Sequence, residues 1–231
     1  MVSQYETPKL LKGAIYTGDR KTKLFLFTRR SNAVGSELEV IREYNYPDGK
    51  PAARETVTYQ GNQFRGFELK DFQTGSSGAV RSILRPWDSQ RVLHFEYSEK
   101  PGTKAKRAEE PSRPDTLVTD MIPPFLLTHW ERLMRGEDIK CRLVVIQRRE
   151  TVGFTFHKVS SNAEPGKVVV KMSPSGAIIA ALVDPVFFVM EKEAPHHILE
   201  YSGRTTPRIK KGSSWKDLEA VTVFDWANYT P

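Results

Sequence analysis

Short segments in which apolar and polar residues alternate follow one another along the first part of the chain, with turn-forming residues between them. One face of the clearest segment carries Leu38, Val40, Arg42 and Tyr44, and mostly glutamates lie between them. A period of two is typical of a β-strand with one buried and one solvated face. Turn formers such as Pro47-Asp48-Gly49 separate the segments, as in β-hairpins. The pattern therefore predicts an antiparallel, mainly β fold.

The same alternation returns in the second half of the chain. Residues 139–145 and 151–157 predict a hairpin, and further strands are expected at 167–172, 186–191, 197–204 and 220–226. A short helical turn is expected at 175–182. We count about 11 strands in all, and an open sheet of that length must curl because every strand twists.

A helix is expected between the two halves. Its apolar face is formed by residues that recur every three or four positions, namely Ile122, Phe125, Leu126, His129, Trp130, Leu133 and Met134. Pro123 suits a first helical turn, and Gly136 suits the position after the last. The sequence thus predicts a mainly β (α+β) protein, whose long curved antiparallel sheet forms an open or half barrel around one amphipathic helix.

Residues 1–231 are expected to form a single β-rich domain, because this length lies within the range of large one-domain β folds. Residues 101–115 combine lysine, arginine and glutamate with three prolines and almost no apolar residue. Such a segment cannot bury itself, so a mobile basic loop is expected at about 100–115. A division into two domains at this loop is the alternative, although neither half has helices of its own to cover a sheet.

The chain is basic, with a formal net charge of +7 and a pI near 9.4. The basic residues are spread over residues 20–30, 100–107 and 204–211, a pattern that favours solvated loops and strand edges. The alternative is a non-catalytic interaction scaffold whose basic surface attracts anionic partners. We expect no specific nucleic-acid binding.

Targeting signals are sparse. No apolar run approaches the roughly 20 residues of a membrane helix, so no transmembrane segment is expected. Residues 1–12 lack the basic start and the apolar stretch of a secretory signal, so no signal peptide is expected in this chain. A signal that has already been removed is the alternative. The residues themselves indicate neither a compartment nor an oligomeric state.

One set of residues offers the chemical types of a nucleophilic site: Cys141, His129 and Asp120. A thiolate needs an adjacent imidazole to activate it, and the imidazole needs an orienting group. Cys141, however, is in register with Ile139 and Leu143, which favours a small buried residue in a strand. As the lone cysteine, it also excludes an internal disulfide and a multi-cysteine zinc site. We expect no catalytic residues, although an enzyme using His129, or the pair His196 and His197, stays an alternative.

A second set offers metal-ligand types, namely His196, His197 and Glu200. In a strand His196 and Glu200 would share one face while His197 points away, and two ligands do not complete a site. The flexible turn at Gly75–Gly78 lacks the glycine and lysine spacing of a phosphate-binding loop. We therefore expect neither a metal nor a cofactor.

Aromatic and methionine side chains are more numerous than one helix interface requires. Core packing explains most of them, but an incompletely closed sheet would leave the surplus lining an apolar groove for a hydrophobic ligand. The groove candidates are Met121, Phe125, His129, Trp130, Leu133, Met134, Phe154, Phe156 and Phe188.

Two segments resemble a bacterial family of exported β-rich proteins of unknown function. Residues 121–156 read MIPPFLLTHWERLMRGEDIKCRLVVIQRRETVGFTF, and residues 182–205 read LVDPVFFVMEKEAPHHILEYSGRT. In the first half the likeness is limited to residues 13–16, GAIY. This family is in turn similar to the half-barrel lipoprotein carriers, whose concave apolar surface holds acyl chains. The resemblance implies a periplasmic or envelope location and a carrier or binder of lipid-like ligands. No acyl-binding motif can be transferred residue by residue.

The leading functional hypothesis is accordingly a non-enzymatic envelope protein that binds or carries a lipid or another hydrophobic small molecule in a half-barrel groove. The alternative is the basic interaction scaffold, and a hydrolase is the third hypothesis.

Overall fold

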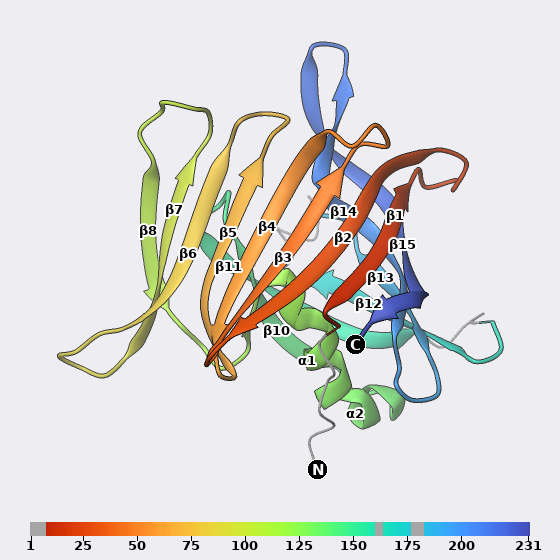
Figure 1. The fold of residues 1–231 in the computed structure, drawn as a ribbon. Coiled ribbons are helices and arrows are strands. Elements are labelled where there is room, and N and C mark those ends of the chain that lie inside the picture. The colour runs from red at the N-terminus through yellow and green to blue at the C-terminus, as the bar shows by residue number, and fades with distance from the viewer. Residues whose placement is uncertain (1–7, 160–163, 177–182) are drawn as a thin grey trace.

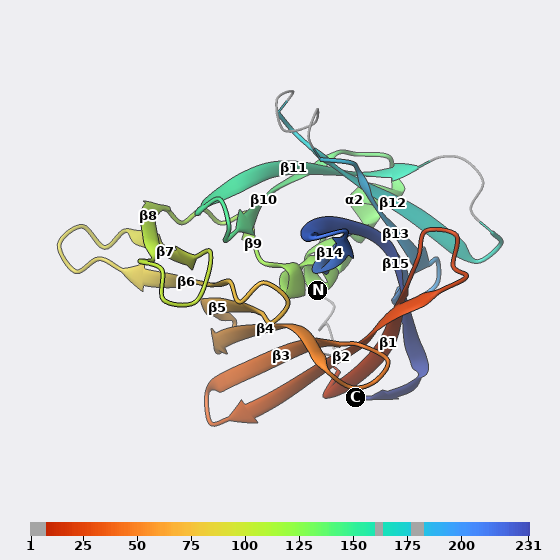
Figure 2. The same ribbon diagram turned by 90° about the horizontal axis from the view of Figure 1, so that it is seen from above.

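The structure is a computed structural model that describes residues 8–159, 164–176 and 183–231. It is mainly β, with 62% of the described residues in strands and 7% in helices. The strands form one long, curved sheet that does not close on itself (Figures 1 and 2). The predicted fold class is confirmed at this level. The helical turn expected at 175–182 lies outside the described residues except for its first two positions.

The sheet is a meander in which most neighbours along the chain are also neighbours in space. Its order is β8-β7-β6-β5-β4-β3-β2-β1-β15-β14-β13-β12-β11-β10-β9. The strands are β1 (Leu10–Tyr16), β2 (Lys23–Val34), β3 (Glu37–Asn45), β4 (Pro51–Gln60), β5 (Gln63–Asp71), β6 (Ser77–Leu84), β7 (Arg91–Ser98), β8 (Lys106–Pro111), β9 (Thr116–Leu117), β10 (Ile139–Val145), β11 (Glu150–Val159), β12 (Lys167–Pro174), β13 (Val186–Glu191), β14 (Ile198–Lys211) and β15 (Ser214–Thr230). All neighbours pair antiparallel except β9 and β10, which pair parallel. β1 and β15, near the two ends of the chain, join the two halves of the sheet.

The connection expected at 100–115 differs from the prediction. Residues 106–111 form β8, the edge strand beside β7. An edge strand tolerates charged residues and a proline because one of its sides needs no hydrogen-bond partner. β8 also contacts β11, which belongs to the other half of the sheet. The Glu110 carboxylate accepts a hydrogen bond of 3.0 Å from the backbone N–H of Thr151 in β11.

The helical segment covers the expected residues but is broken into two short helices, where the sequence predicted one. A 3-10 turn (Thr119–Met121) leads into α1 (Ile122–Thr128), and α2 (Trp130–Met134) follows after a break at His129. The His129 Nδ1 lies 2.9 Å from the carbonyl oxygen of Phe125, so the side chain competes for a helical acceptor at the break. Gly136 follows the last turn with a φ of 86°, as expected for a helix C-terminus.

The curvature brings the two ends of the sheet into contact. Val144 and Ile146, in and just after β10, belong to one buried cluster with side chains of β3 to β7 such as Leu93. Gly78 in β6 makes this approach possible: a Cβ at position 78 would lie 2.2 Å from the Ile146 Cγ2. A second buried cluster joins the helices to β10–β13 and contains Phe156, which is 0% exposed.

Candidate functional site

A cavity of about 880 Å³ lies between the concave face of the sheet and the helical segment. Figure 2 shows the helical segment inside the curve of the sheet, and Figure 1 shows α2 at the lower end of the strands. The cavity is lined by residues of both halves of the sheet, with β1–β3 from the first half and β10 and β12–β15 from the second, and by residues of the helical segment. Ligand pockets typically measure roughly 300–1,000 Å³, so this cavity has room for a substantial small molecule.

One wall of the cavity is apolar. Its residues come from β10, β12, β13, β15 and α1, and they are Ile122, Leu127, Leu143, Met172, Phe188, Met190 and Phe224. Each projects inward because alternate residues of a strand face the same side. A wall of aliphatic, thioether and aromatic side chains suits a hydrocarbon chain, and offers no hydrogen bond to a polar ligand.

A second wall of the cavity is polar, and behind it lies a hydrogen-bonded network centred on Glu55 of β4. The Glu55 Oε2 accepts bonds from Arg42 Nη1 (2.7 Å) and Thr119 Oγ1 (3.1 Å), and its Oε1 accepts a bond from the Thr206 hydroxyl. Burial raises the pKa of Tyr44, which adjoins this network, so its phenol stays neutral at physiological pH. The network links β3, β4, β14 and the turn before α1, and it fixes where these elements meet.

A second buried pair lies beside this network. The Asp120 carboxylate accepts hydrogen bonds from Arg29 Nε (2.7 Å) and Nη2 (3.3 Å), and from the Tyr59 hydroxyl (3.0 Å). Arg29 Nη1 also donates to the carbonyl oxygen of Pro8 (2.7 Å). Both charged side chains of the pair are less than a tenth exposed. The pair therefore fastens the start of the helical segment to β2 and β4.

Stacked aromatic rings border the cavity between β13 and β14. His196 stacks on Trp130 of α2 with ring centroids 4.0 Å apart, and His197 stacks on Trp226 of β15 at 3.8 Å. The His197 Nδ1 also lies 3.0 Å from a carboxylate oxygen of Glu191. All four rings line the cavity, so this border is built from flat, amphipathic side chains.

The structure divides the groove candidates into two groups. Trp130 and Phe188 line the cavity. The others belong to the core between the helices and β10–β13, or pack against it: Met121, Phe125, Leu133, Met134, Phe154 and Phe156. His129 is half-buried, and its ring adjoins that of Phe125 at 4.4 Å. Periodicity alone cannot separate core from cavity, because both face the same side of a strand.

The residues of the polar wall were not expected from the sequence to belong to a binding site. Arg42, Tyr44 and Thr206 were not among the candidates, although Arg42 was placed on the same strand face as Leu38 and Val40. An arginine on an otherwise apolar face is the signal that could have found it, since a buried charge requires a partner.

The residue types of a nucleophilic site are present in Asp120, His129 and Cys141, but the surroundings of each do not favour that role. Asp120 binds Arg29, and the His129 imidazole lies against the Phe125 carbonyl. Burial raises the pKa of the Cys141 thiol to about 12, and the nearby Asp115 contributes to the shift. A thiol that stays protonated is a weak nucleophile, so Cys141 lacks the activation that covalent catalysis requires.

Two of the possible metal ligands, Glu200 and His197, have other partners. The Glu200 carboxylate pairs with Arg20 at 2.6 Å, and His197 faces Glu191. Among the residues that the structure describes, no group of three or more histidine, cysteine or acidic side chains is arranged to hold a metal ion. In the same residues, no helix has both the length and the apolar composition to cross a membrane.

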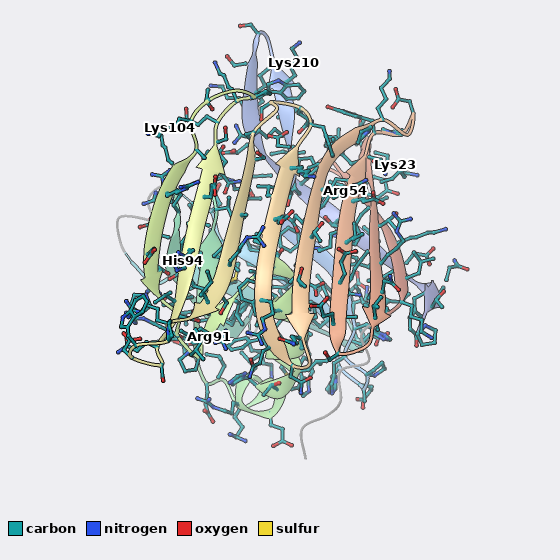
Figure 3. The ribbon with its side chains drawn as sticks, turned by 60° about the vertical axis from the view of Figure 1, so that its left-hand side comes forward. Lys23, Arg54, Arg91, His94, Lys104 and Lys210 are labelled. Atoms are coloured by element: carbon teal, nitrogen blue, oxygen red, sulfur yellow. The ribbon has the colours of Figure 1, made fainter. Side chains whose placement is uncertain are left out.

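The outer face of the sheet carries charges in cross-strand pairs. Arg54 pairs with Glu43 at 2.7 Å, and His94 faces Glu109 at 2.9 Å. Figure 3 shows basic side chains, including Lys23 and Lys210, dispersed over this face and the loops at both ends. The charges do not gather into one patch on the face shown there.

No protein family, curated protein or solved structure matches this chain. We therefore infer the function from the cavity and its walls.

Proposed function

We propose that the protein is a non-enzymatic binder or carrier of a lipid-like hydrophobic small molecule. In this proposal the curved sheet acts as a half-barrel, the helical segment presents its amphipathic face to it, and the ligand lies between them. The observation that carries the proposal is the cavity of about 880 Å³ with one continuous apolar wall. The resemblance of residues 121–156 and 182–205 to exported bacterial β-rich proteins supports an envelope location.

The alternative is a scaffold whose basic surface recruits an anionic partner. The net charge of +7 supports it, but the cross-strand pairs on the outer face weaken it, because paired and dispersed charges attract a partner less than a patch. Binding that falls steeply as salt is added would favour this alternative.

A substitution that fills the cavity tests the proposal. Leu127 of α1 lines the cavity and is not one of the fully buried core residues. Leu127→Trp is expected to weaken binding of the uncharged fluorescent probe N-phenyl-1-naphthylamine at least about tenfold, or about 1.4 kcal/mol, because the indole occupies the space of the ligand. The measurement is a fluorescence titration of each variant.

The matched control is Leu26→Trp. Leu26 lies on β2 between Phe27 and Phe25, faces the opposite side of the sheet and is 37% exposed. The control should bind the probe like the unmodified protein. Equal affinity in both variants, or no probe binding to the unmodified protein, would contradict the proposal.

A further inference from the structure

Arg42 is held in the cavity wall with part of its hydrogen-bonding capacity unused. Its side chain is 16% exposed and lines the cavity. Among the described residues, Glu55 is its only hydrogen-bond partner, through Nη1. A guanidinium has five N–H donors, so Nε and Nη2 remain available. Neither nitrogen is among the fully buried, unpartnered atoms of the described residues, so both are in contact with solvent.

The neighbouring Arg29 is a guanidinium that has a hydrogen-bond partner at every nitrogen. All three of its nitrogens are bonded, two to Asp120 and one to the Pro8 carbonyl. Arg29 therefore has a structural role. Arg42, on the neighbouring strand β3, donates through Nη1 to Glu55, whereas its Nε and Nη2 have no partner among the described residues.

The surroundings hold Arg42 in place and keep it charged. Its guanidinium lies 5.5 Å from the ring centre of Phe27 and 6.0 Å from that of Tyr44, so both aromatic rings restrict its orientation. Burial acts to lower the pKa of Arg42, but the neighbouring carboxylates of Glu55 and Asp120 act against it, and the pKa is raised. A rigid, permanently charged donor is ready to bind an oxygen anion without rearrangement.

The four arginines that line the cavity are all paired with carboxylates. Arg29 pairs with Asp120, Arg132 with Glu137 and Arg204 with Asp217. Arg42 pairs with Glu55, whose oxygens are also bonded to Thr119 and Thr206. Arg42 therefore differs from Arg29 not by an excess of positive charge but by the N–H groups that its partner leaves unused.

We propose that the ligand is an amphipathic molecule with an anionic oxygen headgroup, a carboxylate or a phosphate, which accepts hydrogen bonds from Nε and Nη2 of Arg42. Its hydrocarbon tail lies along the apolar wall, over Leu143, Met172 and Phe188. This inference rests on the proposed function and adds the headgroup chemistry to it.

The test compares three ligands that share one tail. Palmitate, hexadecyl phosphate and hexadecanol are each used to displace bound N-phenyl-1-naphthylamine. The acids are expected to displace the probe at least about tenfold more effectively than the alcohol, because hydrogen bonds to a charged group are worth more than neutral ones. Palmitate ahead of hexadecyl phosphate would indicate a free fatty acid, and the reverse order a phosphorylated lipid; either order supports the anionic site.

Two variants test whether Arg42 is responsible for the preference for acids over the alcohol. Removal of Arg42 alone would leave the Glu55 charge buried, so the double variant Arg42→Met/Glu55→Gln removes both charges together. It is expected to retain probe binding and to reduce the preference for acids below about threefold. The matched control is Arg54→Met, an arginine on the outer face of the sheet that is 45% exposed and paired with Glu43. The control should keep the preference.

The outcomes separate the two proposals. Absence of probe binding in the unmodified protein overturns the proposed function and this inference with it. Probe binding with equal displacement by acids and alcohol overturns the anionic headgroup alone. An undiminished preference in the double variant also overturns the assignment to Arg42.

Discussion

Replacement of Asp120 by alanine is expected to lower the free energy of unfolding by roughly 3–5 kcal/mol, because it leaves the Arg29 charge buried without its partner. The side chains of this pair are 6% and 7% exposed, so water cannot replace the lost carboxylate. The substitution also removes the acceptor of the Tyr59 hydroxyl, whose pKa is raised by burial and by the Asp120 charge. Urea denaturation at neutral pH measures the change.

An exposed pair serves as the control. Arg204 and Asp217 lie 2.6 Å apart, but their side chains are 44% and 48% exposed. Asp217→Ala should cost less than about 1 kcal/mol, since solvent screens such pairs. The variant Arg29→Met/Asp120→Leu should lie closer to the unmodified protein than Asp120→Ala does. Equal costs for the two aspartates would contradict a structural role for the buried pair.

Replacement of Phe156 by alanine is expected to cost roughly 3–5 kcal/mol, the usual effect of removing a phenyl group from a packed interior. Phe156 is 0% exposed, and its ring lies 5.8 Å from that of Phe125 and 6.0 Å from that of Phe188. Because Phe156 does not line the cavity, the folded variant should bind N-phenyl-1-naphthylamine with unchanged affinity. Urea denaturation and a probe titration give the two values.

Phe187→Ala is the comparison for this variant. Phe187 precedes Phe188 on β13, faces the other side of the sheet and is 37% exposed. Its loss should cost less than about 1 kcal/mol. If Phe156→Ala were instead fully stable and unable to bind the probe, Phe156 would belong to the ligand site and the division between core and cavity would be wrong.

The local patterns of the sequence were enough to predict the class of fold. Alternation in residues 37–44 and 139–145 corresponds to β3 and β10, and Gly136 ends the helical segment as its position predicted. β8 was missed because it is an edge strand stabilised on one side by β7 and by the contact of Glu110 with β11. Its charged composition carries no local signal of either contact.

The site was less predictable than the fold. Trp130 and Phe188 line the cavity, whereas Phe154 and Phe156 face the same side of β11 and lie in the core. Which residues border a cavity depends on how far the sheet curves, and curvature arises from contacts between residues far apart in the chain. The position of Arg42 on an apolar strand face was visible in the sequence, but its partner Glu55 belongs to the next strand and no local pattern joins them.

Native mass spectrometry of the purified protein, followed by extraction of whatever is released on denaturation, tests most directly whether the cavity holds a ligand. The predicted result is a folded mass that exceeds the denatured mass by one amphipathic molecule, which is released from the unmodified protein and absent from Leu127→Trp. A folded mass equal to that of the bare chain, together with failure to take up added palmitate, would contradict a function in binding lipid-like ligands.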